Sequence, residues 1–103
     1  MKLWPDQNGS LSREAIRRYI ERRQADLVDC HRGLLRSDFS AAERVGHNLK
    51  GNGVTFGFPE LSELGGELER VALSRDQAAT ENCLLVLAGW VGKNQDQAKA
   101  DKD

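Results

Sequence analysis

The spacing of the apolar residues constrains this chain more than any other feature of its sequence. From Ile16 to Val91 they recur every three or four positions, which is the period of an α-helix with one buried face. Alternating apolar and polar runs, the pattern of half-buried strands, are nearly absent. Only two prolines occur, Pro5 and Pro59. The pattern therefore predicts an all-α fold.

A polar lead of about ten residues precedes the first predicted helix, and Trp4 in this lead is expected to pack onto the folded domain. Ser12, or Ser10 with a slightly earlier start, has a side chain that commonly caps a helix. The helix is predicted to run to about residue 36, with an apolar inner stripe and an arginine-rich outer face. The predicted inner residues are Ile16, Ile20, Ala25, Leu27, Cys30 and Leu34, and the predicted outer arginines are Arg17, Arg18, Arg22 and Arg23.

Two shorter helices are predicted in the middle of the chain. The first of these has Asp38 or Ser40 available as its cap, and Gly53 and Gly57 mark where it weakens and ends. The next begins at Pro59, a residue suited to a first helical turn, and runs to about residue 73. The pair Gly65-Gly66 within it disfavours helix formation locally, so a close approach of another helix is expected there as compensation. The predicted inner residues of this helix are Leu61, Leu64, Leu68 and Val71.

A fourth helix is predicted after the link at 74–76, and from about Lys93 the chain loses its periodicity and is expected to fray. Four amphipathic helices with short links predict an antiparallel up-down four-helix bundle. The bundle is placed at about 11–93, with a polar tail at 94–103. The predicted inner residues of the fourth helix are Ala79, Cys83, Leu84, Val86, Leu87, Trp90 and Val91.

Length and composition predict one domain over residues 1–103 and limit the possible binding partners and cellular compartment. Fifteen basic and sixteen acidic residues give a net charge of -1, which argues against a general nucleic-acid binder. No signal peptide and no apolar run long enough to span a membrane is present, and Cys30 and Cys83 lack CxxC spacing, so we expect a soluble protein in a reducing, cytoplasmic setting. We also expect it to be a monomer. Cys30 and His31 are consecutive and diverge on a helix, so no metal site is expected.

One stretch of the second helix carries the functional signal. Its helical spacing places His47, Lys50, Gly51 and Val54 together on the face opposite Ala42, Val45, Leu49 and Phe56. A histidine that points away from the core is available for chemistry. A glycine inside a helix costs about 0.8–1 kcal/mol relative to alanine, so we expect Gly51 to leave room beside the imidazole for a large partner.

The order of these residues carries a family resemblance. A histidine is followed by a lysine three residues on, a glycine directly after that lysine, and a glycine ten residues from the histidine: His47, Lys50, Gly51 and Gly57. This resembles the active-site motif of histidine phosphotransfer (HPt) domains of two-component phosphorelays. By motif the resemblance covers residues 39–73, and by helix pattern it covers nearly the whole chain.

Two further features extend the resemblance. HPt domains often have a Gln or Glu that hydrogen-bonds the imidazole from 22 residues further on, a position occupied here by Glu69. The stretch Thr55-Phe56-Gly57-Phe58 is also similar to the phosphotransfer domain at the head of chemotaxis-type histidine kinases. The resemblance implies that His47 is the phosphoacceptor, with Lys50 and Glu69 assisting it. The expected partner-binding residues around it are Arg44, Asn48, Gly51, Val54 and Gly57.

The missing motifs bear on whether the chain is an enzyme. It has no P-loop, no glycine-rich ATP lid and no acidic cluster of the kind that would hold Mg²⁺ around a phosphate. The resemblance implies a carrier without a cofactor, phosphorylated on His47 by a receiver-domain aspartate, with Mg²⁺ only on the receiver. The implied partners are response-regulator receiver domains and a hybrid sensor histidine kinase.

Three alternatives remain open at this point. The chain could be the phosphotransfer domain of a chemotaxis-type kinase, phosphorylated by an ATP-dependent kinase domain. It could be a four-helix interaction module without phosphotransfer, although the intact motif at His47 argues against this. A dimeric histidine-kinase helix pair fits less well, because that class places an acidic residue directly after its histidine and this chain has Asn48.

Overall fold

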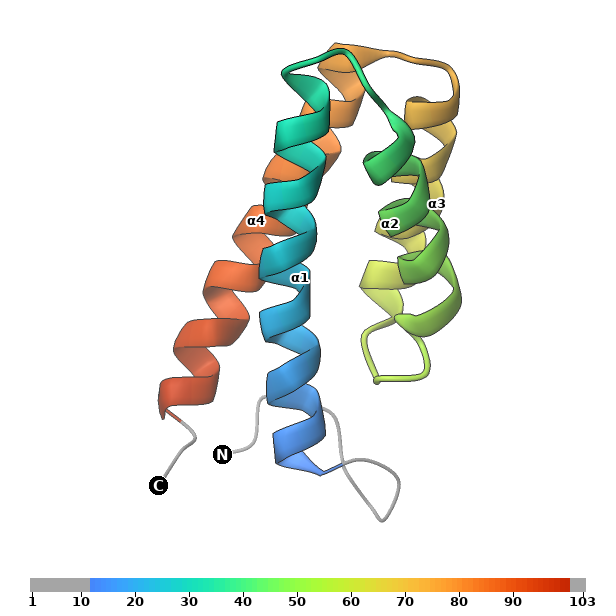
Figure 1. Cartoon of the computed structure of the whole chain (residues 1–103). Helices are drawn as coiled ribbons and strands as arrows, with labels where there is room; N and C mark the ends of the chain where they lie inside the picture. Colours follow the sequence, from blue (N-terminus) through green and yellow to red (C-terminus); the bar gives the residue numbers. More distant parts are fainter. Residues whose placement is uncertain (1–11, 101–103) are drawn as a thin grey trace.

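Four helices form an antiparallel up-down bundle in a computed structural model that describes residues 12–100, with side chains through Asp96. They are α1 (Arg13–Leu34), α2 (Ser40–Asn52), α3 (Pro59–Leu73) and α4 (Gln77–Ala100). The α1–α2 and α3–α4 links lie at one end, and the α2–α3 link lies at the other (Figure 1). The predicted fold class is therefore confirmed. Trp4 and Ser10 lie outside the described residues.

Local capping sets the start of the first two helices. The Ser12 hydroxyl accepts a hydrogen bond from the Ala15 backbone N–H at 3.0 Å, as the sequence predicts. At α2 the capping position itself is Phe39, and the Asp38 carboxylate accepts the Ser40 backbone N–H at 2.9 Å from one residue further out. Asp38 thus satisfies the first amide of α2, and Ser40 is already its first helical residue.

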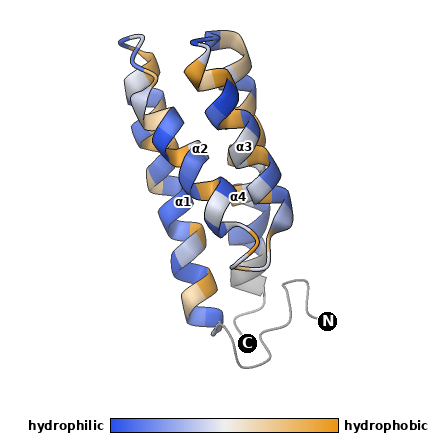
Figure 2. Cartoon of the chain, turned by 90° about the vertical axis from the view of Figure 1, so that its right-hand side faces the viewer, coloured by the Kyte–Doolittle hydropathy of each residue, from blue (hydrophilic) through white to orange (hydrophobic). Residues whose placement is uncertain are grey.

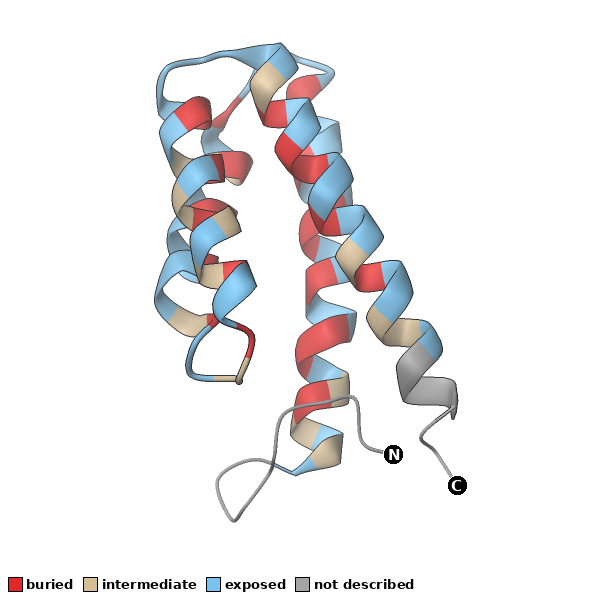
Figure 3. Cartoon of the chain, turned by 180° about the vertical axis from the view of Figure 1, so that it is seen from behind, coloured by how far each residue is buried: buried red, intermediate tan, exposed pale blue. Residues whose placement is uncertain are grey.

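Apolar residues from all four helices build a single core. Hydrophilic and hydrophobic residues are interspersed along the helices (Figure 2), and the buried residues lie on the inward sides of the helices (Figure 3). The largest fully buried side chains include Ile16 and Ile20 of α1, Leu49 of α2, Leu61 and Leu68 of α3, and Leu84, Leu87 and Val91 of α4.

For three residues the prediction of a buried or an exposed side chain was wrong. Ala25 is exposed and Arg23 is buried, because α1 also buries Tyr19 and Asp26, and the Tyr19 hydroxyl reaches Asn52 in the last turn of α2. The Arg23 guanidinium hydrogen-bonds the Asp26 carboxylate at 2.8 Å and lies 4.3 Å from the centre of the Tyr19 ring, so its charge is compensated inside the bundle. On α4, Val86 is 60% exposed, since its neighbours Leu84 and Leu87 fill the inward positions.

The end of α4 also differs from the expectation. The helix continues through Lys93 to Ala100, beyond the residue at which the sequence pattern loses its periodicity. The Asn94 side-chain amide donates a hydrogen bond to the Trp90 carbonyl at 2.8 Å on this last part of the helix. None of the four helices, within the part of the chain that is described, is both long and apolar enough to cross a membrane.

Candidate functional site

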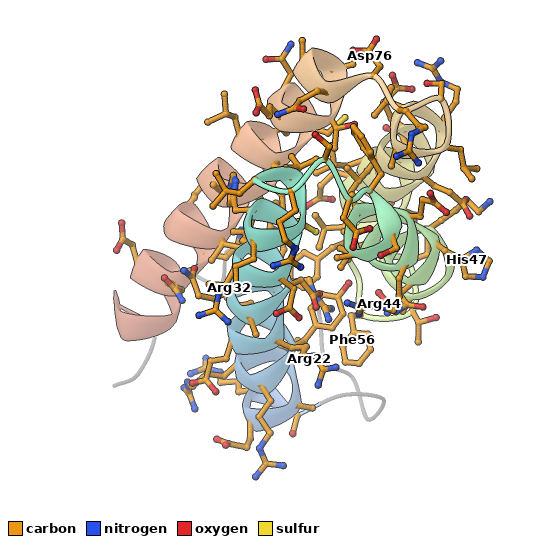
Figure 4. The ribbon with its side chains drawn as sticks, turned by 45° about the horizontal axis from the view of Figure 1, so that its top comes forward. Arg22, Arg32, Arg44, His47, Phe56 and Asp76 are labelled. Carbon is orange, nitrogen blue, oxygen red and sulfur yellow. The ribbon has the colours of Figure 1, made fainter. Side chains whose placement is uncertain are left out.

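His47 lies on the face of α2 that points away from the core. Ala42, Val45 and Leu49 of the same helix are buried, whereas the His47 side chain is 68% exposed. Figure 4 shows the imidazole projecting outward from the ribbon. The predicted orientation of the two faces of α2 is therefore confirmed, and the ring is accessible to a second protein.

Two glycines let α2 and α3 approach closely beside His47. A Cβ atom at Gly46 would lie 2.5 Å from the backbone nitrogen of Glu69, and one at Gly65 would lie 2.5 Å from the backbone nitrogen of Lys50. No larger residue fits at either position without moving a helix. The close approach predicted at Gly65 is confirmed. Because Gly46 directly precedes His47, this contact also places Glu69 next to the imidazole.

Glu69 on α3 contacts both candidate residues of α2. Its Oε2 lies 3.0 Å from His47 Nδ1, and its Oε1 lies 2.8 Å from Lys50 Nζ. The Lys50 ammonium, and to a smaller extent the imidazole, hold the pKa of the Glu69 carboxyl below its usual value, while partial burial opposes the shift. These contacts therefore favour the ionised form of the Glu69 carboxylate.

The contact with Glu69 distinguishes the two ring nitrogens of His47. An ionised carboxylate only accepts hydrogen bonds, so Nδ1 of His47 carries the proton that lies between them. In a neutral imidazole the other nitrogen, Nε2, is then unprotonated and has a free lone pair. The nitrogen of His47 that does not contact Glu69 is thus the one with a free lone pair, on a side chain that is mostly exposed.

Beyond this cluster, the surface is open along α2. A Cβ at Gly51 would meet no atom within 4 Å, and Val54 is 62% exposed. Asn48 is exposed as well. Gly57 lies in the following turn with φ of 87°, a conformation that favours glycine, so its role in this structure is to turn the chain toward α3.

A family comparison agrees with this geometry. The family model of the Hpt domain matches residues 14–95. This range includes all four helices except the first residue of α1 and the last residues of α4. The chain belongs to the Hpt domain family. Comparison with curated proteins and with solved structures found no significant match. Membership gives this Hpt domain a role in histidine phosphotransfer within phosphorelays, as a phosphocarrier with kinase and receiver domains as partners.

Arg44 occupies a different position from the other expected residues. Its guanidinium lies 3.9 Å from the Asp29 carboxylate of α1, and both side chains are about half exposed. Figure 4 shows Arg44 on the side of α2 nearer α1, away from the projecting His47 ring. The structure therefore brings His47, Lys50 and Glu69 together and directs Arg44 toward α1.

Sequence reasoning missed three residues that hold α2 in place. The sequence shows a glycine, Gly46, directly before His47, but it does not show that this glycine contacts α3. The Ser62 hydroxyl of α3 accepts the Val54 backbone N–H at 2.9 Å just beyond the end of α2. The amide oxygen of Asn52 accepts the Tyr19 hydroxyl at 2.7 Å, which ties the last turn of α2 to α1. Isolated serine and asparagine residues give no such signal in a sequence.

No metal-binding group was found in the part of the chain with described side chains. Among those residues, no three histidine, cysteine, aspartate or glutamate side chains gather closely enough to hold a metal ion. The cluster on α2 and α3 consists of the His47 imidazole, the Glu69 carboxylate and the Lys50 ammonium.

Proposed function

We propose that this Hpt domain carries a phosphoryl group on Nε2 of His47, between the aspartates of two receiver domains. The observation that carries the proposal is the contact of Glu69 with Nδ1, because it leaves Nε2 unprotonated on the exposed side of the ring. Transfer to the domain breaks the P–O bond of an aspartyl phosphate and forms a P–N bond to Nε2. The carboxylate of the receiver leaves, and the proton on Nδ1 stays with the ring.

The other residues of the site support this step without performing it. Lys50 is 54% exposed and lies one turn from His47, where its ammonium offsets charge on the phosphoryl oxygens. Gly51 leaves the surface open for the loops of a receiver. We assign Mg²⁺ and the acidic residues that bind it to the receiver, so the partner supplies most of the catalysis.

We further propose that the domain acts as a monomer in the cytoplasm, with a hybrid sensor histidine kinase as its upstream partner. Cys30 and Cys83 are buried free thiols, which suits a reducing compartment. A second function keeps one observation in its favour: the Thr55-Phe56-Gly57-Phe58 turn is similar to that of chemotaxis-type kinases, in which ATP is the donor through a kinase domain.

The proposal is tested by offering the protein both kinds of phosphoryl donor, a receiver domain and an ATP-dependent kinase. The purified protein is incubated with a panel of phosphorylated receiver domains and, separately, with ATP and a chemotaxis-type kinase core. We expect label from receivers that is lost in acid and stable in base, as for a phosphorylated imidazole. Label from the kinase core alone would support the second function, and acid-stable label would contradict both.

A further inference from the structure

The two adjacent glycines of α3 have different surroundings. Gly65 faces the backbone of α2, so its lack of a side chain follows from the helix contact. Gly66 faces no backbone of another helix: the nearest atoms to a Cβ built there are Cδ and Cγ of Lys50, at 3.6 and 3.9 Å. The close approach expected for the glycine pair therefore explains Gly65 and leaves Gly66 to be explained.

The Lys50 side chain follows a defined path over α3. Its methylene groups lie against Gly66, and its ammonium lies 2.8 Å from Glu69 Oε1. Residues 66 and 69 are three apart on one helix and so share a face. Lys50 thus leaves α2, crosses the surface of α3 at Gly66, and ends at the carboxylate that also holds the His47 ring.

We infer that Gly66 is a positioning residue for phosphotransfer, which keeps this path clear so that Lys50 reaches Glu69. The inference rests on the proposed function. A methyl group would touch the lysine stem at an ordinary contact distance. A longer side chain would occupy the space of the Lys50 methylenes and turn the ammonium out into solvent, leaving Glu69 with one partner in place of two.

This displacement has two consequences for the site. Glu69 would lose the strongest influence that lowers its pKa. The cation would also leave its place one turn from His47, where it offsets charge on the phosphoryl oxygens. A bulky residue at 66 should therefore reproduce the loss of Lys50 without altering Lys50 itself.

The test compares Gly66→Ala with Gly66→Leu and Gly66→Gln, two side chains of similar length and different polarity, so that a fold defect in one leaves the other. Gly89→Leu is the matched control, because a Cβ at Gly89 on α4 meets nothing within 4 Å. The first readout is the titration of the Glu69 carboxyl by NMR in the unphosphorylated protein. We expect the pKa of Glu69 to rise toward its usual value in the two bulky variants only.

The second readout is the rate of phosphotransfer, alone and in a Lys50→Ala background. The bulky variants should be about tenfold slower than wild type, a change of ~1.4 kcal/mol in the barrier, and should add nothing once Lys50 is removed. Unchanged Glu69 titration, or further slowing in the Lys50→Ala background, would overturn the inference. If the wild-type protein accepts no phosphoryl group, the proposed function fails while the titration still decides the role of Gly66.

Discussion

Replacing Gly51 separates stability from function in this domain. Gly51 is in the last turn of α2, and a Cβ there meets no atom within 4 Å. Alanine therefore adds helix propensity without a clash, and Gly51→Ala should stabilise the fold by up to ~1 kcal/mol. In a domain of this size that corresponds to a rise in Tm of up to roughly 4–8 °C, measurable by circular dichroism.

Function should change in the opposite direction. Residue 51 is one turn from His47, so a side chain there stands beside the imidazole where a receiver must close. We expect transfer to slow a few-fold in Gly51→Ala and about tenfold or more in Gly51→Gln, a change of ~1.4 kcal/mol or more. Gly89→Gln, on an equally open position of α4, should leave transfer unchanged. If Tm and transfer fall together in the Gly51 variants, Gly51 serves packing and the recognition surface is misplaced.

Three further predictions concern the cluster itself. Gly46→Ala should lower the free energy of unfolding by about 1–3 kcal/mol, because the new Cβ would force α2 from α3 at Glu69; a melt at or above the wild-type Tm would contradict this. Lys50→Ala should slow transfer without abolishing it. Since Lys50 lowers the pKa of Glu69, its stabilising effect is present above the usual pKa of a glutamate and is lost as pH falls through the lower folded value. The difference in Tm between wild type and Lys50→Ala should therefore shrink in acid, and a constant difference would argue against the pair. Glu69→Gln keeps an oxygen acceptor for His47 Nδ1 and should retain more transfer activity than Glu69→Ala; equal rates would show that the hydrogen bond does not matter.

Helical periodicity was sufficient for the fold and for the direction of His47. It fixes which side of α2 is apolar, so Ala42, Val45 and Leu49 had to turn inward and the imidazole outward. Glu69 was different: its place beside His47 depends on how α2 and α3 meet, and the sequence indicated it only through a family resemblance. The contact that brings it there, at Gly46, joins residues 23 positions apart and leaves no local pattern.

Two of the errors concern polar residues that the sequence pattern placed in solvent or outside a helix. Arg23 is buried because Asp26 and the Tyr19 ring interact with its charge, which offsets part of the cost of removing that charge from water. The end of α4 was placed too early: the helix continues to Ala100, and in this part the Asn94 side chain is half-buried and hydrogen-bonds the Trp90 carbonyl.

The central claim is that the phosphoryl group resides on His47, and mapping the label tests it most directly. Wild type, His47→Gln and His31→Gln are incubated with the same phosphorylated receiver, and the melting of each variant is recorded. Both histidines are exposed, so neither substitution should disturb the fold. We predict acid-labile label on wild type and His31→Gln and none on a folded His47→Gln protein. Label that persists in folded His47→Gln would contradict the account.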